Sequence, residues 1–180
     1  MIDIYKEKFT SLQNEIIKFL FIKSGLSFNQ RQIAQNLNVS PTAISKSIKD
    51  IEKVGIVIIK KESPNRFIVE LNKQNPKIFN LKRVENLKMI YESGLQAVLS
   101  ENFPACTIIL FGSFSLGEDI IASDVDIAII GAKEKALKLD GFEKILERKI
   151  SLHFYKNFKE IDIKSGLSNA ENAIYLRHHK

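Results

Sequence analysis

Residues 108–130 read IILFGSFSLGEDIIASDVDIAII, and this stretch decides the fold of the second half of the chain. Its first four residues end an almost continuous apolar run, Ala105–Phe111, and this run predicts a strand buried on both faces. Gly112 and Ser113 then begin a turn into a short helix, and a second apolar run from Asp124 to Ile130 predicts another strand. The pattern therefore predicts two strands joined by a short helix and a loop.

Four residues of this stretch form a candidate phosphate and metal site. Gly112 lets another backbone approach closely, and Ser113, at a helix start, offers its hydroxyl and nearby N–H groups to a phosphate. Asp124 and Asp126 lie two residues apart, so both carboxylates project from one face of the strand. Mg²⁺ is typically bound by one or two carboxylates together with substrate phosphate oxygens. A carboxylate at Asp126, amid apolar residues, is costly without a partner, and the simplest partner is a cation.

This constellation resembles the signature of the polymerase-beta-type nucleotidyltransferase superfamily, over roughly residues 80–178. The shared parts are Gly-Ser after a strand, a loop that ends in Ser-Asp, and Asp-x-Asp on the next strand. The resemblance implies that Gly112 and Ser113 hold a nucleoside triphosphate, and that Asp124 and Asp126 act as catalytic ligands of Mg²⁺ or Mn²⁺. It also implies transfer of a nucleoside monophosphate to a hydroxyl.

The sequence departs from that pattern in two places. Active members use a third carboxylate on a neighbouring strand, and the corresponding run, Lys149–Tyr155, holds Ser151 and then His153 on the same face. His153 is a candidate catalytic base, or else a polar residue in a site that has lost its third ligand. Phe114 replaces the basic residue that many members carry after Gly-Ser. Binding of Mg-nucleotide with weak or lost transfer is therefore expected, with an active transferase as the alternative.

The first third of the chain predicts three helices and a β-hairpin. Apolar residues recur at spacings of three and four from Phe9 to Leu20, which indicates the first helix. The other predicted elements are a helix over Gln30–Leu37 capped by Asn29, a helix from Pro41 to about Val54 capped by Ser40, and strands over Ile56–Lys61 and Arg66–Leu71.

The third of these helices has two contrasting faces. Its apolar face carries Ile44, Ile48, Ile51 and Val54. Its polar face and the predicted hairpin carry the candidate DNA contacts, which are Thr42, Ser45, Lys46, Lys49, Lys53, Lys60, Lys61 and Arg66.

The segment over roughly residues 8–72 resembles a winged helix-turn-helix domain of the bacterial and archaeal regulator type. The resemblance is carried by the run from Arg31 to Ser45 and by the run from Ile51 to Lys60. It implies double-stranded DNA as a partner.

The distribution of charge also distinguishes the first part of the chain from the second. The chain has 180 residues and a formal net charge of +6, and residues 1–75 hold 12 Lys and Arg against 7 Asp and Glu. An excess of cations in one module suggests a polyanionic partner. One cysteine excludes a disulfide framework, and no apolar run is long enough to span a bilayer. The charged N-terminus lacks the apolar region of a secretory signal, so we expect a cytoplasmic protein without membrane attachment.

The sequence thus predicts an α+β protein of two domains. Residues 1–75 are expected to form a winged helix-turn-helix, and residues 76–180 a small mixed sheet with helices of nucleotidyltransferase type. A further helix is predicted over Phe79–Ser100, with a weak point at Gly94, from apolar residues near helical spacing: Leu81, Val84, Leu87, Leu95, Val98 and Leu99. Other predicted helices cover Gly141–Glu147 and a tail over Phe158–Arg177.

The sequence is compatible with three functions from different classes. The first is a DNA-binding regulator whose second domain senses a nucleotide or mediates association. The second is an active nucleotidyltransferase delivered to a nucleic-acid or protein substrate. The third is an antitoxin-like module with a small helical toxin-like partner, which the resemblance alone suggests. A homodimer also remains open.

Overall fold

A computed structural model describes residues 9–64, 66–160 and 173–177. The chain divides into two compact units, Met1–Ile78 and Phe79–Lys180, each of which is described by itself. Among the described residues, no helix combines the length and the apolarity needed to cross a membrane.

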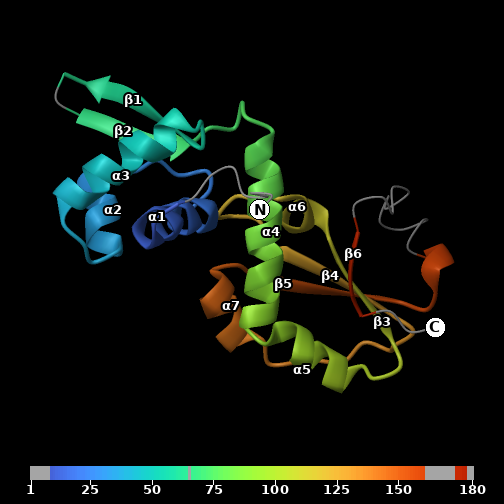
Figure 1. The fold of residues 1–180 in the computed structure, drawn as a ribbon. Helices are drawn as coiled ribbons and strands as arrows, with labels where there is room; N and C mark the ends of the chain where they lie inside the picture. The colour runs from blue at the N-terminus through green and yellow to red at the C-terminus, as the bar shows by residue number, and fades with distance from the viewer. Residues whose placement is uncertain (1–8, 65, 161–172, 178–180) are drawn as a thin grey trace, which may run out of the picture. The chain divides into compact units, whose positions relative to one another are not determined.

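The first unit contains three helices followed by an antiparallel hairpin (Figure 1). Its elements are α1 (Ser11–Ile22), α2 (Gln30–Asn36), α3 (Pro41–Lys53), β1 (Val57–Ser63) and β2 (Arg66–Leu71). The predicted caps are confirmed, because the Asn29 side chain accepts a hydrogen bond from the Gln32 N–H, and Ser40 caps α3 with Pro41 at its first position. The predicted winged helix-turn-helix architecture is therefore confirmed.

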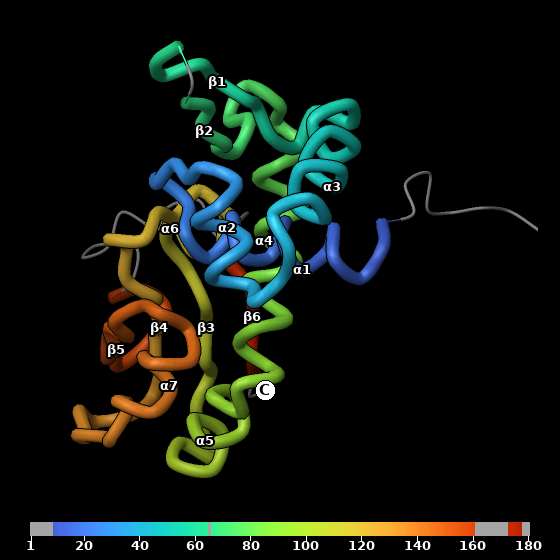
Figure 2. Tube along the Cα trace, turned by 90° about the vertical axis from the view of Figure 1, so that its left-hand side faces the viewer, coloured from blue at the N-terminus to red at the C-terminus, as the bar shows by residue number. Residues whose placement is uncertain are grey.

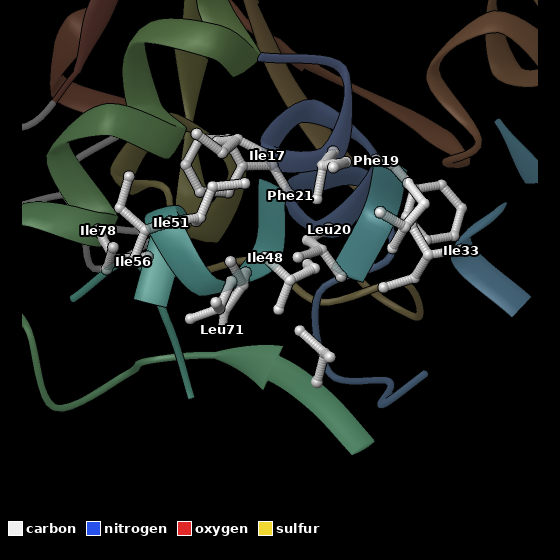
Figure 3. Close-up of a cluster of buried hydrophobic side chains, with 14 of the residues drawn as sticks. Ile17, Phe19, Leu20, Phe21, Ile33, Ile48, Ile51, Ile56, Leu71 and Ile78 are labelled. Atoms are coloured by element: carbon white, nitrogen blue, oxygen red, sulfur yellow. The ribbon is translucent and has the colours of Figure 1, made fainter. Parts of the chain in front are cut away.

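One apolar cluster fills the first unit (Figure 3). Ile44, Ile48 and Ile51 of α3 are fully buried in it, as predicted from their spacing. Val54 was predicted on the same face but is 37% exposed, because it is the C-cap residue beyond the last helical turn. Phe28, just before α2, exchanges two backbone hydrogen bonds with Val69 of β2, at 3.0 and 2.7 Å. This bridge ties the start of α2 to the hairpin.

The second unit is built on a small mixed sheet of strand order β5-β4-β3-β6 (Figure 2). Its strands are β3 (Thr107–Phe111), β4 (Val125–Ile130), β5 (Ile150–Tyr155) and β6 (Ile174–Arg177). β3 is antiparallel to β4 and to β6, whereas β4 and β5 are parallel. The predicted sheet type is confirmed.

The helices of the second unit are α4 (Lys77–Glu92), α5 (Leu95–Asn102), α6 (Gly112–Leu116) and α7 (Asp140–Leu146). The predicted continuous helix over residues 79–100 is wrong, because Gly94 has a φ of +80° and separates α4 from α5. α5 leads into Phe103, whose ring packs edge-on against that of Phe154 of β5, at 5.7 Å between centroids. The α5 end therefore packs on the sheet face that carries Phe154.

The predicted helical tail is wrong at its end, where Ile174–Arg177 forms β6. The main-chain groups on this side of β3 need partners, and β6 supplies them through the pairing of Ile109 with Tyr175. Arg177 also donates to the Ser100 carbonyl at 2.6 Å, which fastens the strand to α5. Residues 161–172 of the predicted tail lie outside the described residues.

The buried face of α4 differs from the one that its apolar spacing predicts. Leu81 and Val84 are 43% and 68% exposed, whereas Lys82 and Asn86 are buried with exposures of 1% and 3%. These two polar side chains lie one helical turn apart and reach Asp119, which is itself 1% exposed. The buried face of α4 therefore combines this polar cluster with the apolar residues Ile78, Met89 and Ile90.

Candidate functional site

Gly112 and Asp126 meet at the end of β3. Phe111, the last residue of β3, pairs with Asp126 of β4, so the following residue lies beside the carboxylate. Gly112 has a φ of +71°, and a Cβ added there would lie 2.6 Å from Asp126 Oδ2. Both the backbone conformation and the available space therefore require glycine at this position. The structure thus brings together Gly112 and Asp126, two of the predicted site residues.

Ser151 and His153 each contact one of the two carboxylates. The Ser151 hydroxyl donates to Asp124 Oδ2 at 3.0 Å, and His153 Nε2 lies 3.1 Å from Asp126 Oδ1. The parallel register pairs Asp126 with Ser151, which places these side chains on one face of the sheet. The His153 ring also packs edge-on against Phe111, at 5.2 Å between centroids.

The sequence predicts that Asp126 needs a partner, most simply a cation, and the structure places the His153 imidazole against it. Its side chain is 29% exposed, because it lies at the strand end beside Gly112, and its partner is His153. Solvent and the imidazole together lower the cost of the charge. Asp124 lies one residue before β4, so only Asp126 is a strand residue. Asp124 and Asp126 nevertheless contact Ser151 and His153, which lie two residues apart on β5, and this agrees with the prediction that the two carboxylates share one face.

A hollow of about 570 Å³ opens beside Asp124. It lies between the loop that precedes β4 and the α7 region, and its lining includes Ser123, Lys144 and Lys149 besides Asp124. Asp140, Glu143, Glu147 and Arg148 also line it, so a ligand in this hollow would meet side chains of both charges. No described residues form a group of three or more His, Cys, Asp or Glu side chains that could hold a metal ion.

A buried polar cluster under α6 was missed by the sequence reasoning. Asp119 accepts hydrogen bonds from Lys82 and from Asn86, the latter at 2.7 Å, and pairs with Arg148 at 3.1 Å. Asn86 also donates to the Phe114 carbonyl of α6 at 2.9 Å. The cluster therefore connects α4, α6, the loop before Asp124 and the segment between α7 and β5 that contains Arg148.

Gly117 also allows α6 to pack closely against α4. It has a φ of +74°, and a Cβ there would lie 2.2 Å from the Phe79 carbonyl oxygen, so α6 ends directly against the backbone of α4. The spacing of Lys82 and Asn86, four residues apart on a helix, was the signal available in the sequence. That spacing alone does not identify the buried face.

The candidate DNA contacts of the first unit fall into two groups. Ion pairs hold three of the cations: Lys53 with Asp50 at 3.1 Å, Lys60 with Glu70, and Arg66 with Glu62 at 2.6 Å. Within the described part of the chain, Lys46, Lys49 and Lys61 are exposed and have no acidic partner. Thr42 is exposed and Ser45 half-buried on the same helix as Lys46. The strongest positive potential is therefore expected on α3 rather than on the hairpin.

Comparison with known families agrees with both units. A family model described as an HTH domain matches residues 12–64, and one described as polymerase beta, nucleotidyltransferase, matches residues 93–179. These matches confirm the predicted combination of a helix-turn-helix domain with a nucleotidyltransferase domain.

Two solved structures of ZitR from Lactococcus lactis also match in part. The first is a double mutant, with 20% identity over 56% of this chain and 74% of that chain, at a TM-score of 0.36. The second is described as a zinc-responsive MarR family member, with 19% identity over 57% of this chain and 82% of that chain, at a TM-score of 0.34. Likeness at this level carries no functional argument. The comparison with curated proteins found no match.

Proposed function

We propose that this chain, which joins a winged helix-turn-helix domain to a nucleotidyltransferase domain, is a DNA-binding regulator that binds Mg-nucleotide. Its transfer of the nucleoside monophosphate to a hydroxyl, with release of pyrophosphate, would be weak or absent. Residues 1–75 would bind double-stranded DNA, and residues 76–180 would bind the nucleotide. One observation carries the proposal: Ser151 occupies the position next to Asp126 where a third carboxylate would be needed.

The DNA-binding part rests on the outer face of α3. Lys46 and Lys49 project from the helix whose opposite side is fixed by Ile44 and Ile48 in the core. A rigid helix with mobile ammonium groups on one side fits a groove lined by phosphates. Because these lysines have no acidic partner among the described residues, they bind phosphate without first breaking an ion pair.

We expect the double variant Lys46→Ala, Lys49→Ala to bind duplex DNA about 30-fold more weakly at about 0.15 M salt. Each phosphate contact contributes about 0.9 to the slope of log K against log salt, so the slope should fall by about 1.8. Fluorescence anisotropy over a salt series measures both quantities. Lys133→Ala with Lys138→Ala, two exposed lysines of the second unit, is the matched control. Identical slopes for the test variant and the parent would show that α3 does not contact phosphate.

The second domain contains residues that fit one divalent cation. Asp124 and Asp126 each use one oxygen for a protein partner, which leaves Asp124 Oδ1 and Asp126 Oδ2 to bind a metal. Mg²⁺ or Mn²⁺ held there would neutralise the phosphates of a bound nucleotide and polarise them. Gly112 keeps the space next to Asp126 Oδ2 free of a side chain, and Ser113 follows it with a hydroxyl for a phosphate oxygen.

The same residues explain why transfer is expected to be weak. In-line transfer needs the acceptor hydroxyl to lose its proton, and a positioned base typically contributes about 10²–10⁴ to the rate. Ser151 donates its hydroxyl proton to Asp124, so it is neither a base nor an anionic ligand. Asp124, Asp126 and Ser151 are therefore better suited to bind a nucleotide than to catalyse nucleotidyl transfer.

We expect Asp126→Asn to abolish the heat of MgATP binding in isothermal titration calorimetry. The amide lacks the negative charge that holds a divalent cation, although its size and its contact with His153 are similar. Glu134→Gln removes one exposed carboxylate of the same unit and is expected to bind like the parent. Equal affinities of the parent and Asp126→Asn would make Asp126 a purely structural partner of His153.

An active nucleotidyltransferase is the second candidate function, and one observation favours it. His153 is 40% exposed, and its Nε2 atom contacts Asp126, so an imidazole lies beside the residues proposed to bind the metal. In that case His153 would take the proton of a protein or nucleic-acid hydroxyl. A helical toxin-like partner and a homodimer stay predictions, and the proposal does not depend on either.

A further inference from the structure

A second groove, of about 640 Å³, lies in the first unit between the hairpin and the helices. Its walls come from the start of α2, from the outer side of α3 and from the hairpin. The lining includes Arg31, Lys49, Ile59, Arg66 and Phe67. None of the described residues that line it is acidic.

Phe67 lies in this groove because the hairpin extends beyond the core. Cross-strand pairing puts Phe67 on the same face of the hairpin as Val69 and Leu71, which are the core-facing residues of β2. Val69 is fully buried and Leu71 is 7% exposed, whereas Phe67 is 49% exposed. An aromatic ring therefore lies on the inner side of the hairpin, where the described residues leave about half of it exposed to solvent.

Cationic side chains line the same groove as that ring. Arg31 and Lys49 are exposed, and the described residues offer neither of them an ion pair or hydrogen-bond partner. The Phe28–Val69 bridge fixes the start of α2 along β2, which keeps Arg31 near the hairpin. Arg66 is paired with Glu62 and contributes less to the positive charge.

We propose that this groove binds an unpaired nucleotide of single-stranded DNA, with the base stacked on Phe67 and the flanking phosphates on Arg31 and Lys49. An aromatic ring and cations in one groove match the alternation of base and phosphate along a single strand. Bases in a duplex are stacked on one another, so their faces are not available to Phe67. The inference rests on the proposed DNA-binding function and adds a site that recognises unpaired bases, which shares Lys49 with the outer face of α3.

The main test compares oligo-dT, which has no self-pairing, with a mixed-sequence duplex by fluorescence anisotropy on the full chain. Phe67→Ala should bind oligo-dT about 5- to 150-fold more weakly, the range for loss of one stacked base. It should bind the duplex within about twofold of the parent, which is a small change on the scale of one lost stack. Phe67→Tyr, which keeps a ring, should bind both like the parent. Phe158→Ala removes a ring that is 46% exposed in the second unit and serves as the control.

A direct probe of the ring position is available because the chain has no tryptophan. Phe67→Trp introduces a single indole, whose fluorescence should be quenched on titration with oligo-dT and changed little by the duplex. Arg31→Ala in this background should move the quenching to higher oligonucleotide concentration, since one phosphate contact is lost.

The outcomes separate this inference from the function on which it rests. Binding of oligo-dT that Phe67→Ala leaves unchanged, or an equal loss for oligo-dT and duplex, overturns the stacking site. A parent that binds duplex but not oligo-dT overturns the site and leaves the proposed function standing. A parent that binds neither DNA overturns both.

Discussion

Asp119→Asn is expected to destabilise the second unit by about 3–5 kcal/mol, the usual effect of removing one member of a buried ion pair. Lys82 and Arg148 share the Asp119 carboxylate, and all three side chains are nearly inaccessible to solvent. The asparagine keeps the shape of the site but removes the negative charge. The two buried cations then lose the anion that they share, and the loop before Asp124 loses its anchor.

The effect can be measured by urea unfolding followed through the near-ultraviolet signal of tyrosine. Tyr91, Tyr155 and Tyr175 are three of the four tyrosines and belong to the second unit, so the signal reports mainly on that unit. Glu118→Gln, an exposed carboxylate beside Asp119, should unfold at the parent's midpoint. If Asp119→Asn unfolded at that midpoint too, the cluster would not support the fold.

Ser151→Asp is expected to raise nucleotidyl transfer by about 100-fold, within the range of about 10²–10⁴ for a positioned base. Ser151 pairs with Asp126 in the parallel register and already lies within hydrogen-bond distance of Asp124. An aspartate there places a third carboxylate beside the other two. The initial rate of label incorporation from α-labelled nucleotide, with Mg²⁺ or Mn²⁺, measures the gain.

A matched variant distinguishes the new carboxylate from a general change at this position. Ser151→Asn has nearly the same size as aspartate but carries no charge, so it should transfer no faster than the parent. Equal rates for Ser151→Asp and Ser151→Asn would show that the third carboxylate is not what the site lacks.

The sequence predicts the first unit well, because its signals are local. Asn29 and Ser40 cap helices where their positions indicate, and the spacing of Ile44, Ile48 and Ile51 identifies the buried side of α3. Capping and helical periodicity depend on residues a few positions apart, so they can be read without knowing the tertiary structure.

Two of the errors in the second unit come from contacts between residues far apart in the sequence. Asp119 pairs with Arg148 across 29 positions and makes Lys82 a core residue, which no local pattern of α4 can reveal. Arg177 belongs to a strand because β6 pairs with the edge of β3 that β4 does not occupy, although the sequence before Arg177 suggests a helix.

The candidate nucleotide site was predictable in part. Strand, Gly-Ser and Asp-x-Asp place Gly112 beside Asp126, and the parallel partner strand then places Ser151 and His153 next to the carboxylates. The individual bonds, Ser151 to Asp124 and His153 to Asp126, depend on the exact register of β4 and β5 and required the structure. On the DNA side, only the structure shows that Glu62 and Glu70 neutralise hairpin cations.

The most direct test of the central claim is label transfer by the parent protein under conditions in which calorimetry shows that MgATP is bound. Candidate protein, DNA and RNA acceptors are incubated with α-labelled ATP and Mg²⁺ or Mn²⁺, with Ser151→Asp as the positive control. The account predicts a bound nucleotide and little or no labelled product from the parent. Robust labelling by the parent that His153→Ala leaves unchanged would contradict it, because the site would then be catalysing transfer without a third carboxylate and without the imidazole.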